Sequence, residues 1–277
     1  MSKLLLKVNS NTIYPGYDLG YILGMEKYSI CFDKKFSIDD VKHFINDNPC
    51  KDVFVALNRV IYNSELEDYK KTLMELDKLG LKGIIVGDIA ALTYDLKTNI
   101  VLDQLHLNNS YLSINHYYKN NGCGCFLTND ITKDEINEIK ENTNAKLLKQ
   151  VFGYTHLSTS VRKLVTNYLK HFKLDDKSSV NYIKEINSDD YYVIKEDEFG
   201  TNILSSKILN LFNEKDEINV DYLVIDSYLL DDGIVNDAVN AFVNNDKVLN
   251  DKLCKLIDTN NGFIDKKTIY KVKNYEK

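Results

Sequence analysis

The sequence predicts an α/β fold: a (β/α)8 TIM-like barrel formed as a single domain over residues 1–277. Two observations favour this fold. Short apolar runs alternate with longer segments of helical period, so that a strand followed by a helix recurs at a spacing of roughly 25 residues, as in parallel βαβ units. Eight such units close a (β/α) barrel, and the 277 residues of this chain are enough to form one.

Each candidate strand is a continuous apolar run rather than an alternating one. This pattern is typical of strands that are buried on both faces of a parallel sheet. In chain order, the predicted strands are Leu4–Val8, Tyr28–Phe32, Val53–Leu57, Gly83–Gly87, Val101–Leu107, Gly122–Leu127, Lys146–Val151 and Tyr222–Ile225.

Capping signals predict helices between the strands. Ser37 starts one helix as an N-cap, and Ser64 opens another that ends at Gly80. Thr132 and Glu135 have the spacing of a capping box. Two further helices are expected at Ser205–Glu214 and Gly233–Asp258, and a weaker one in the first crossover, Asn9–Lys27.

Residues 154–204 are too many for one crossover and predict an insertion after strand seven. Ser158–Phe172 has a helical pattern. Tyr182–Ile186 and Tyr191–Ile194 flank the polar loop Asn187–Asp190, which predicts a β-hairpin. The chain is expected to end in a basic tail, residues 262–277.

Composition and cysteine usage favour a cytoplasmic protein. The first residues lack the apolar core of a signal peptide, and no stretch is long and apolar enough to span a membrane. The net charge of −6 gives no overall attraction to nucleic acid, although a local basic face is compatible with it. An odd number of scattered cysteines favours reduced thiols: Cys31, Cys50, Cys123, Cys125 and Cys254.

In a (β/α) barrel, functional side chains follow the carboxyl ends of the strands. Asp88, His106 and Asp226 stand at such places and are the catalytic candidates, while Asn58 and Asn108 are candidates for substrate binding. Asn129, Asp130 and Gly153 complete the predicted polar ring. The alternative interpretation is structural: each aspartate caps the next helix, and His106 is a satisfied core residue.

No metal site or cofactor is predicted. Cys123 and Cys125 lie one residue apart on a predicted strand, and this spacing is not the CxxC of metal sites. Phosphate-binding glycine loops, the GxSxG nucleophile motif and the HExxH zinc motif are all missing from the sequence.

The segment after strand seven is rich in basic and hydroxyl side chains. Arg162 and Lys163, followed by Asn167 and Tyr168, are candidates for binding phosphate or RNA. The alternative interpretation is an ordinary solvated helix face.

Several short pieces of the sequence, in this order and spacing, resemble the collagenase-like peptidase family "U-thirty-two". The resemblance runs from Phe36 to Tyr270. The pieces are Val53–Asn58 with Asn63, Ile85–Asp88, Leu105–Asn108, Val151–Gly153, Arg162 with Asn167–Tyr168, Glu196–Thr201 and Val220–Asp226.

Within that family the chain is similar to the short, single-barrel bacterial members. The resemblance implies a role with a longer paralogue in tRNA wobble uridine 5-hydroxylation. Several family members hold an iron–sulfur cluster through cysteines, but this chain departs from their pattern. Phe152 stands where the family has His, His156 stands where it has Cys, and Ser158–Tyr168 contains no cysteine, whereas a cluster needs about four thiolates. The lysine usual in the last strand is replaced around Val224.

Three functions remain open at the level of sequence, and whether the chain is an enzyme remains open with them. The first is a divergent or accessory subunit for tRNA hydroxylation that binds tRNA or forms a hetero-oligomer with the longer paralogue. The second is a peptidase, for which Asp88 with His106 would be the acid–base pair. The third is a non-catalytic scaffold for a cysteine-bearing paralogue.

Overall fold

The computed structural model of the chain describes residues 2–175, 178–184, 186–187 and 189–266, with the side chain of His106 also outside the description. The part of the predicted basic tail beyond residue 266 therefore lies outside the described residues. Within these ranges, none of the helices has the length and apolar character that crossing a membrane requires.

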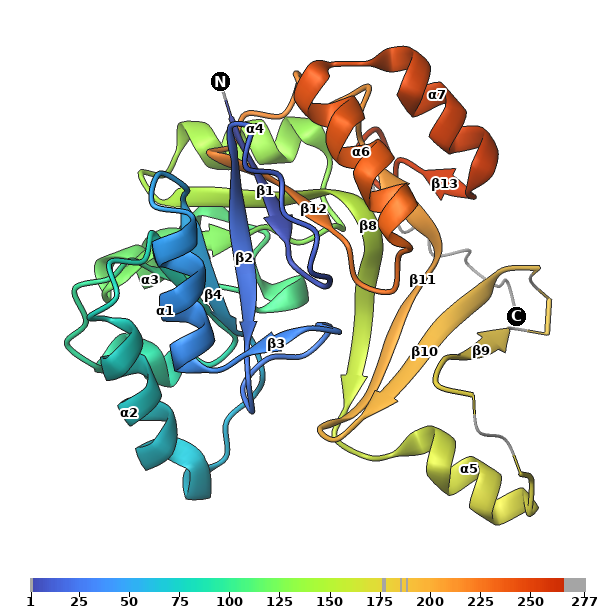
Figure 1. Cartoon of the computed structure of the whole chain (residues 1–277), viewed down its shortest axis with the longest axis horizontal. Coiled ribbons are helices and arrows are strands. Elements are labelled where there is room, and N and C mark those ends of the chain that lie inside the picture. Colours follow the sequence, from blue (N-terminus) through green and yellow to red (C-terminus); the bar gives the residue numbers. More distant parts are fainter. Residues whose placement is uncertain (1, 176–177, 185, 188, 267–277) are drawn as a thin grey trace, which may run out of the picture.

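Eight parallel strands close a barrel, as the sequence predicts (Figure 1). Closure is made by the last strand, which pairs with both the first and the seventh. In barrel order the strands are β1 (Lys3–Lys7), β2 (Leu19–Met25), β4 (Val53–Leu57), β5 (Gly83–Val86), β6 (Ile100–Leu102), β7 (Gly122–Phe126), β8 (Lys146–Ser160) and β12 (Tyr222–Asp226).

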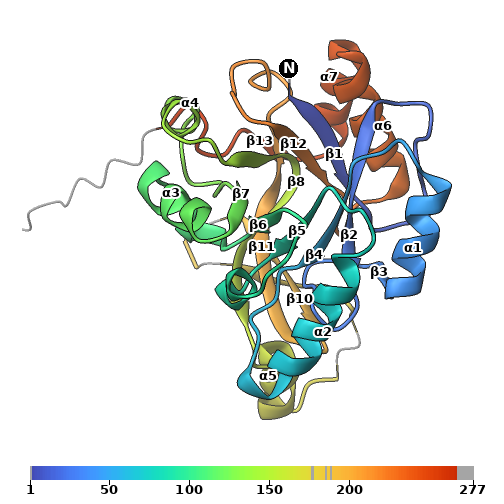
Figure 2. The ribbon, with the colours of Figure 1, turned by 90° about the vertical axis from the view of Figure 1, so that its left-hand side faces the viewer.

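Helices surround the barrel (Figure 2). The N-cap predicted at Ser37 and the capping box predicted at Thr132 are both present, and Ser37 also forms a capping box, with Asp40 as its returning carboxylate. The α-helices outside the insertion are α1 (Ile38–Asp47), α2 (Leu66–Leu76), α3 (Tyr111–Lys119), α4 (Lys133–Glu141), α6 (Asp232–Asn244) and α7 (Lys247–Leu256). Short elements complete the chain: η1 (Asn63–Glu65), η2 (Ile89–Thr93), η3 (Leu105–Leu107), β3 (Lys35–Phe36) and β13 (Thr259–Asn260).

The second barrel strand is not where the sequence predicts it. The strand predicted at Tyr28–Phe32 is wrong, and β2 instead lies inside the crossover Asn9–Lys27, where a weak helix was expected. Two glycines make β2 hard to recognise as a strand from the sequence, because glycine is normally depleted in strands. Both are needed by packing: a Cβ on Gly24 would stand 2.5 Å from the ring of Phe32, and one on Gly20 would stand 2.6 Å from the Asp52 carbonyl.

Four other predicted elements need correction. The helix predicted at Gly233–Asp258 is two helices, α6 and α7, because the chain turns at Asn245, which has a φ of +54°. The strand predicted at Val101–Leu107 ends at Leu102, and the helix predicted from Ser158 begins only at Leu164. The helix predicted at Ser205–Glu214 is wrong, because most of this run belongs to β11. The short apolar run in this segment is compatible with a helix as well as with a strand. It forms a strand because it pairs with β8.

The predicted insertion after strand seven is present, and we call it the arm. It consists of the outer part of β8, from Tyr154 on, α5 (Leu164–Phe172), β9 (Asn181–Lys184), β10 (Tyr191–Asp197) and β11 (Gly200–Asn210). These strands form an antiparallel sheet that continues the barrel strand β8 outward (Figure 1). The predicted hairpin is confirmed as β9 paired with β10.

The far end of the arm rests on the barrel. Phe199, in the turn between β10 and β11, lies between two cations of the barrel: its ring centroid is 4.7 Å from the Arg59 guanidinium and 4.5 Å from Lys35 Nζ. Lys35 also pairs with Glu198 at 2.9 Å. Cation–π contacts of this kind contribute about 0.5–1 kcal/mol each at exposed sites. The arm is therefore attached to the barrel at both ends.

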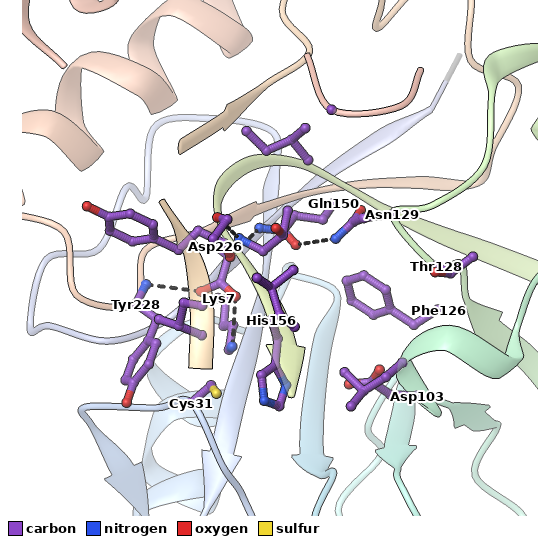
Figure 3. Close-up of a pocket in the computed structure, with 18 of the residues that line it drawn as sticks. Lys7, Cys31, Asp103, Phe126, Thr128, Asn129, Gln150, His156, Asp226 and Tyr228 are labelled. Carbon is purple, nitrogen blue, oxygen red and sulfur yellow. Dashed lines mark hydrogen bonds and ion pairs between the residues drawn. The ribbon is translucent and has the colours of Figure 1, made fainter. Parts of the chain in front are cut away.

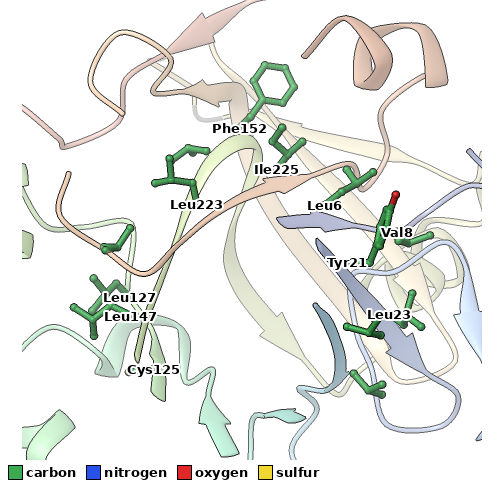
Figure 4. Packing of buried hydrophobic residues seen from close by; sticks show 14 of the residues in the cluster. Leu6, Val8, Tyr21, Leu23, Cys125, Leu127, Leu147, Phe152, Leu223 and Ile225 are labelled. Carbon is green, nitrogen blue, oxygen red and sulfur yellow. The ribbon is translucent and has the colours of Figure 1, made fainter. Parts of the chain in front are cut away.

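Two apolar clusters stabilise the barrel. The smaller one fills the barrel interior and includes Leu5, Phe54 and Leu148. The larger one lies largely between strands and helices, and Figure 4 shows a part of it around Leu6, Tyr21 and other side chains. Because residues along a strand alternate between the two faces, both clusters draw on the same strands.

Candidate functional site

A cavity of about 390 Å³ opens at the carboxyl ends of the barrel strands, and the arm forms one of its walls (Figure 3). The barrel contributes polar side chains at the strand ends, and the arm contributes His156, Leu157, Tyr192 and Leu204. Polar and ionisable lining residues from the barrel are Lys7, Cys31, Asn58, Asp103, Thr128, Asn129, Asp130, Gln150, Asp226 and Tyr228.

The principal charged pair of the cavity joins the first and last barrel strands. Lys7 and Asp226 are partners in the register of β1 and β12, and Lys7 Nζ lies 2.8 Å from Asp226 Oδ2. Asp226 Oδ1 also accepts the backbone N–H of Tyr228 at 3.0 Å. The ammonium stands 4.4 Å from the centroid of the Phe32 ring.

Opposing effects act on the pKa of Lys7. Burial by itself lowers it, but the nearby carboxylates of Asp226 and Asp103 raise it, and the balance lies above its ordinary value. Lys7 is therefore a permanent cation in the physiological range. It is a fixed positive charge at the bottom of the cavity.

Asp103 follows β6 and is the second carboxylate of interest. Burial raises the pKa of its carboxyl group, and the attraction of Lys7 and a hydrogen bond from Asn58 Nδ2 at 3.4 Å only partly oppose this. Two residues further on, Leu105 has a φ of +52°, a conformation that a non-glycine residue adopts only under constraint. Cys31, which also lines the cavity, has a φ of +58°. Backbone strain of this kind gathers at functional sites.

A polar network fixes the opposite rim of the cavity. Gln150 Oε1 accepts from Asn129 Nδ2 at 2.9 Å, and Gln150 Nε2 donates to the Tyr154 carbonyl at 2.9 Å. Behind this rim, buried Lys149 donates to the Thr128 carbonyl at 2.8 Å and to Asn129 Oδ1 at 2.6 Å. Burial lowers the pKa of Lys149 to about 7, although Asp130 acts in the other direction. Lys149 supports the rim and does not line the cavity.

Some of the site residues predicted on the barrel line the cavity, and others do not. Asn58 and Asp226 line the cavity. Asp88 does not, because it caps η2 through Ala90 N at 2.9 Å and accepts Ile61 N, as the structural alternative predicts. Asn108 is buried and donates to the carbonyls of Leu102 and Phe126, so it joins two strand ends away from the cavity. His106 belongs to η3 rather than to a strand, and its side chain lies outside the described residues.

The remaining candidates lie on the arm. Arg162 and Lys163 precede α5, and Asn167 and Tyr168 lie on it. All four are exposed, and none lines the cavity. They form a surface separate from the barrel mouth.

Sequence reasoning missed Lys7, Asp103, Cys31 and Tyr228. Lys7 is the one charged side chain in the predicted strand Leu4–Val8, and Asp103 is the one charged side chain in the predicted strand Val101–Leu107 apart from His106. A charge near the end of a buried parallel strand was the signal that could have found both.

Cys31, the one cysteine among the described residues that line the cavity, is not an activated nucleophile. Burial raises the pKa of the Cys31 thiol to about 12, so it is not a thiolate at neutral pH. His156 Nε2 lies 2.8 Å from Thr159 Oγ1, on the arm. The described residues also contain no group of three or more His, Cys, Asp or Glu side chains placed to hold a metal ion. The described lining of the cavity contains a single cysteine, so it does not fit an iron–sulfur cluster, which needs about four thiolates.

The fold and the site define the class of protein: a (β/α)8 barrel with a polar cavity at its mouth and an arm formed where strand seven, β8, extends beyond the barrel. The sequence profile of Peptidase family U32 matches residues 13–274, and the chain belongs to this family. It is 27% identical over 226 residues to the tRNA hydroxylation protein P2 of Bacillus subtilis (strain 168), covering 76% of this chain and 72% of that protein.

The fold is also found in a solved structure of the family. The U32 peptidase Mk0906 is similar with a TM-score of 0.51 and 12% sequence identity, over 82% of this chain and 92% of that one. This similarity supports the barrel fold alone.

Proposed function

We propose that this chain is a component of a tRNA hydroxylation system and that it serves in the 5-hydroxylation of the wobble uridine, as a divergent or accessory subunit in the cytoplasm. The observation that carries the proposal is the similarity to tRNA hydroxylation protein P2 over three quarters of the chain. The polar cavity at the barrel mouth supports it, because this is the place where (β/α) barrels bind and transform their substrates.

The size and polarity of the cavity suit one base or another small polar molecule. Its 390 Å³ falls in the range of about 300–1,000 Å³ that is usual for small-molecule sites. In the proposed role, Lys7 stabilises negative charge on a bound oxygen atom, and Asp226 holds Lys7 in place. Asp103 is suited to exchange a proton with the substrate, because its raised pKa lies nearer neutrality than that of an ordinary carboxyl group.

The accessory form of the proposal follows from the missing cluster ligands. Phe152 and His156 stand where the family has His and Cys, so any step that needs a cluster falls to another protein. We propose a cysteine-bearing, longer family member as that partner, and we expect no iron–sulfur cluster on this chain. Co-expression followed by gel filtration tests the pairing, and two independent monomers would contradict it.

Peptidase activity, the alternative suggested by the family name, has less support. A hydrolase needs a nucleophile beside a base or a metal-held water. The Cys31 thiol is buried with a raised pKa, and Asp88 is occupied as a helix cap. Cleavage of casein or collagen by the purified protein above background would revive this alternative.

The test of the proposed function is nucleoside mass spectrometry of tRNA from cells that lack the gene. We expect 5-hydroxyuridine and its derivatives to be lost and to return when the wild-type gene is restored. The double variant Lys7→Met/Asp226→Asn removes both charges together, so that no buried charge is left unpaired. We expect it to accumulate normally in cells and to fail to restore the modification.

The matched control is Lys207→Met/Asp258→Asn, which removes an ion pair of 3.4 Å outside the cavity lining, with a half-buried lysine and an exposed aspartate. This control should restore the modification fully. If the modification persists without the gene, the proposed function is wrong. If the Lys7 and Asp226 double variant restores it, the cavity pair has no part in the reaction.

A further inference from the structure

The arm carries the largest concentration of exposed apolar side chains in the described residues. Of the 19 large apolar side chains that are strongly exposed, nine lie between Val161 and Tyr191. Helix α5 contains no buried residue at all. Leu164, Tyr168 and Phe172 follow one another at intervals of four residues on one face of α5, and exposed apolar side chains grouped in this way often mark a binding surface. The nine are Val161, Leu164, Tyr168, Phe172, Leu174, Tyr182, Ile183, Ile186 and Tyr191.

The first part of this segment is basic, although the chain as a whole carries a net charge of −6. From Val161 to Leu174 there is no aspartate or glutamate, although the whole chain has 41 acidic and 35 basic residues. Four cations bracket the helix: Arg162 and Lys163 precede it, and Lys170 and Lys173 lie at its end. This local charge is complementary to a polyanion.

Aromatic rings are interleaved with these cations along the helix. Tyr168 and Phe172 are one helical turn apart, each is more than half exposed, and their ring centroids are 4.7 Å apart. His171 stands against Phe172, with centroids also 4.7 Å apart. Exposed rings flanked by cations are the arrangement on which unpaired bases stack while their phosphates are held.

The N-terminus of α5 is already occupied, so the cationic side chains have to supply the attraction. The carboxylate of Glu196, from β10, accepts the backbone N–H groups of Val165 at 2.9 Å and Thr166 at 3.2 Å, and it also bonds the Thr166 hydroxyl. This contact fixes the helix on the sheet of the arm. The surface is therefore preorganised rather than loosely attached.

We propose that the exposed surface of α5 binds a single-stranded segment of RNA, with bases stacked on Tyr168 and Phe172 and phosphates held by Arg162, Lys163, Lys170 and Lys173. The inference rests on the proposed function, since it states where the tRNA of that function binds. The inner strands of the same arm line the barrel-mouth cavity through His156 and Tyr192. An RNA loop on α5 is thus held by the element that forms the cavity wall.

The experiment measures binding of the full-length protein to two fluorescent probes: an RNA hairpin with a uridine-rich unpaired loop, and a blunt RNA duplex of equal length. We expect the hairpin to bind more tightly, because paired bases cannot stack on the rings. Tyr168→Ala/Phe172→Ala should raise the hairpin Kd at least about tenfold, because the two bases lose the rings on which they stack. Arg162→Ala/Lys163→Ala should reduce the salt dependence, log Kd against log salt, by about 1.4, or roughly 0.7 per phosphate contact.

The matched control is Tyr118→Ala/Lys119→Ala, which removes an exposed tyrosine and a lysine from α3, outside the arm. It should leave the hairpin Kd unchanged. Because the substituted arm side chains are all exposed, circular dichroism should show every variant folded. The inference is overturned if the arm variants bind the hairpin like the wild type. It is equally overturned if they keep RNA affinity and lose a protein partner, because the surface is then a protein interface.

The outcome separates this inference from the proposed function. If 5-hydroxyuridine depends on the gene while the arm variants bind RNA normally, the function stands and the RNA surface lies elsewhere. If the modification does not depend on the gene, the function fails, and the hairpin measurements still decide whether α5 binds RNA.

Discussion

At the scale of single residues, the cavity separates two aspartates by their surroundings. Asp226 is held by the Lys7 ammonium at 2.8 Å, whereas Asp103 accepts a long hydrogen bond from Asn58 and a backbone hydrogen bond from Leu105 and has a raised pKa. Carboxyl groups that differ in this way take different roles in an active site. The proposed chemistry therefore assigns the fixed charges to the Lys7–Asp226 pair and proton exchange to Asp103.

Replacing Asp103 by asparagine should stabilise the protein at neutral pH. The folded-state pKa lies above the ordinary value of 3.8, so the folded protein binds more protons than the unfolded chain above that pH, and stability falls as the pH rises through this window. The introduced amide would imitate the neutral acid and avoid the burial of a charge. Urea denaturation at pH 7 and at about pH 3 measures the effect, and we expect the gain to shrink at the lower pH. A variant less stable than wild type at pH 7 would contradict this reasoning.

The sequence was sufficient for part of this site. Asn58 and Asp226 were predicted because each directly follows an apolar strand. Lys7 and Asp103 were not predicted, because both lie inside runs that the apolar pattern assigns to strands. The strand β1 ends at Lys7 rather than at Val8, and β6 ends at Leu102 rather than at Leu107. Asp88 has the same sequence signal as Asp226 and is a helix cap, and only the coordinates distinguish the two.

At the scale of elements, the arm depends on a contact between β10 and α5. Burial raises the pKa of Glu196, and hydrogen bonds from Thr166, Thr201 and Val165 more than offset this, so that its pKa is lowered. The stabilisation from this carboxylate is present above its ordinary value of 4.5 and is lost as the pH falls through the lower, folded-state value.

Replacing Glu196 by alanine should loosen α5 without unfolding the barrel. The amides of Val165 and Thr166 would lose their acceptor, which is equivalent to losing a helix N-cap and costs about 1–2 kcal/mol. We expect hydrogen exchange of the α5 amides to accelerate roughly tenfold, while exchange in the barrel strands stays unchanged. Lys195→Ala, the preceding residue of the same strand, is the control. Equal exchange in the two variants would show that Glu196 does not anchor the helix.

The elements that the sequence predicted correctly have strong local signals. The capping boxes at Ser37 and Thr132 fixed the starts of two helices. The missed strand β2 contains Gly20 and Gly24, whose presence reflects close packing against Asp52 and Phe32, far away in the sequence. In β11, the apolar run for which the sequence predicted a helix forms a strand because it pairs with β8. Contacts between distant segments therefore decided the elements that local pattern could not.

At the scale of the whole molecule, barrel and arm meet at one glycine. Gly153 has a φ of +113°, and a Cβ there would lie 2.2 Å from the carbonyl oxygen of Asp226. At this point β8 leaves the barrel, beside the strand that closes it. Neither the backbone conformation nor the space admits another residue.

Gly153→Ala should therefore destabilise the entire protein. The forced backbone conformation and the overlap together should cost at least about 3 kcal/mol. For a chain of this length that corresponds to a melting temperature roughly 6–12 °C lower, which differential scanning calorimetry measures. Gly16→Ala is the control, because nothing lies within 4 Å of a Cβ at that position, and it should change stability by less than about 0.5 kcal/mol. Similar melting temperatures for the two variants would rule out a special role for Gly153.

The arm extends the barrel strand β8, with β11 paired against it, rather than being a separate module on a linker, and this bears on how its length can evolve. The pairing of β8 with β11 is irregular only near the cavity, between Ile203 and Ile208, and is regular towards the tip. Because side chains alternate along a strand, residues gained or lost in opposite pairs beyond Ile203 preserve which face each side chain occupies. A change in the length of the arm of this kind alters how far it extends from the barrel and leaves the cavity at the barrel mouth unchanged.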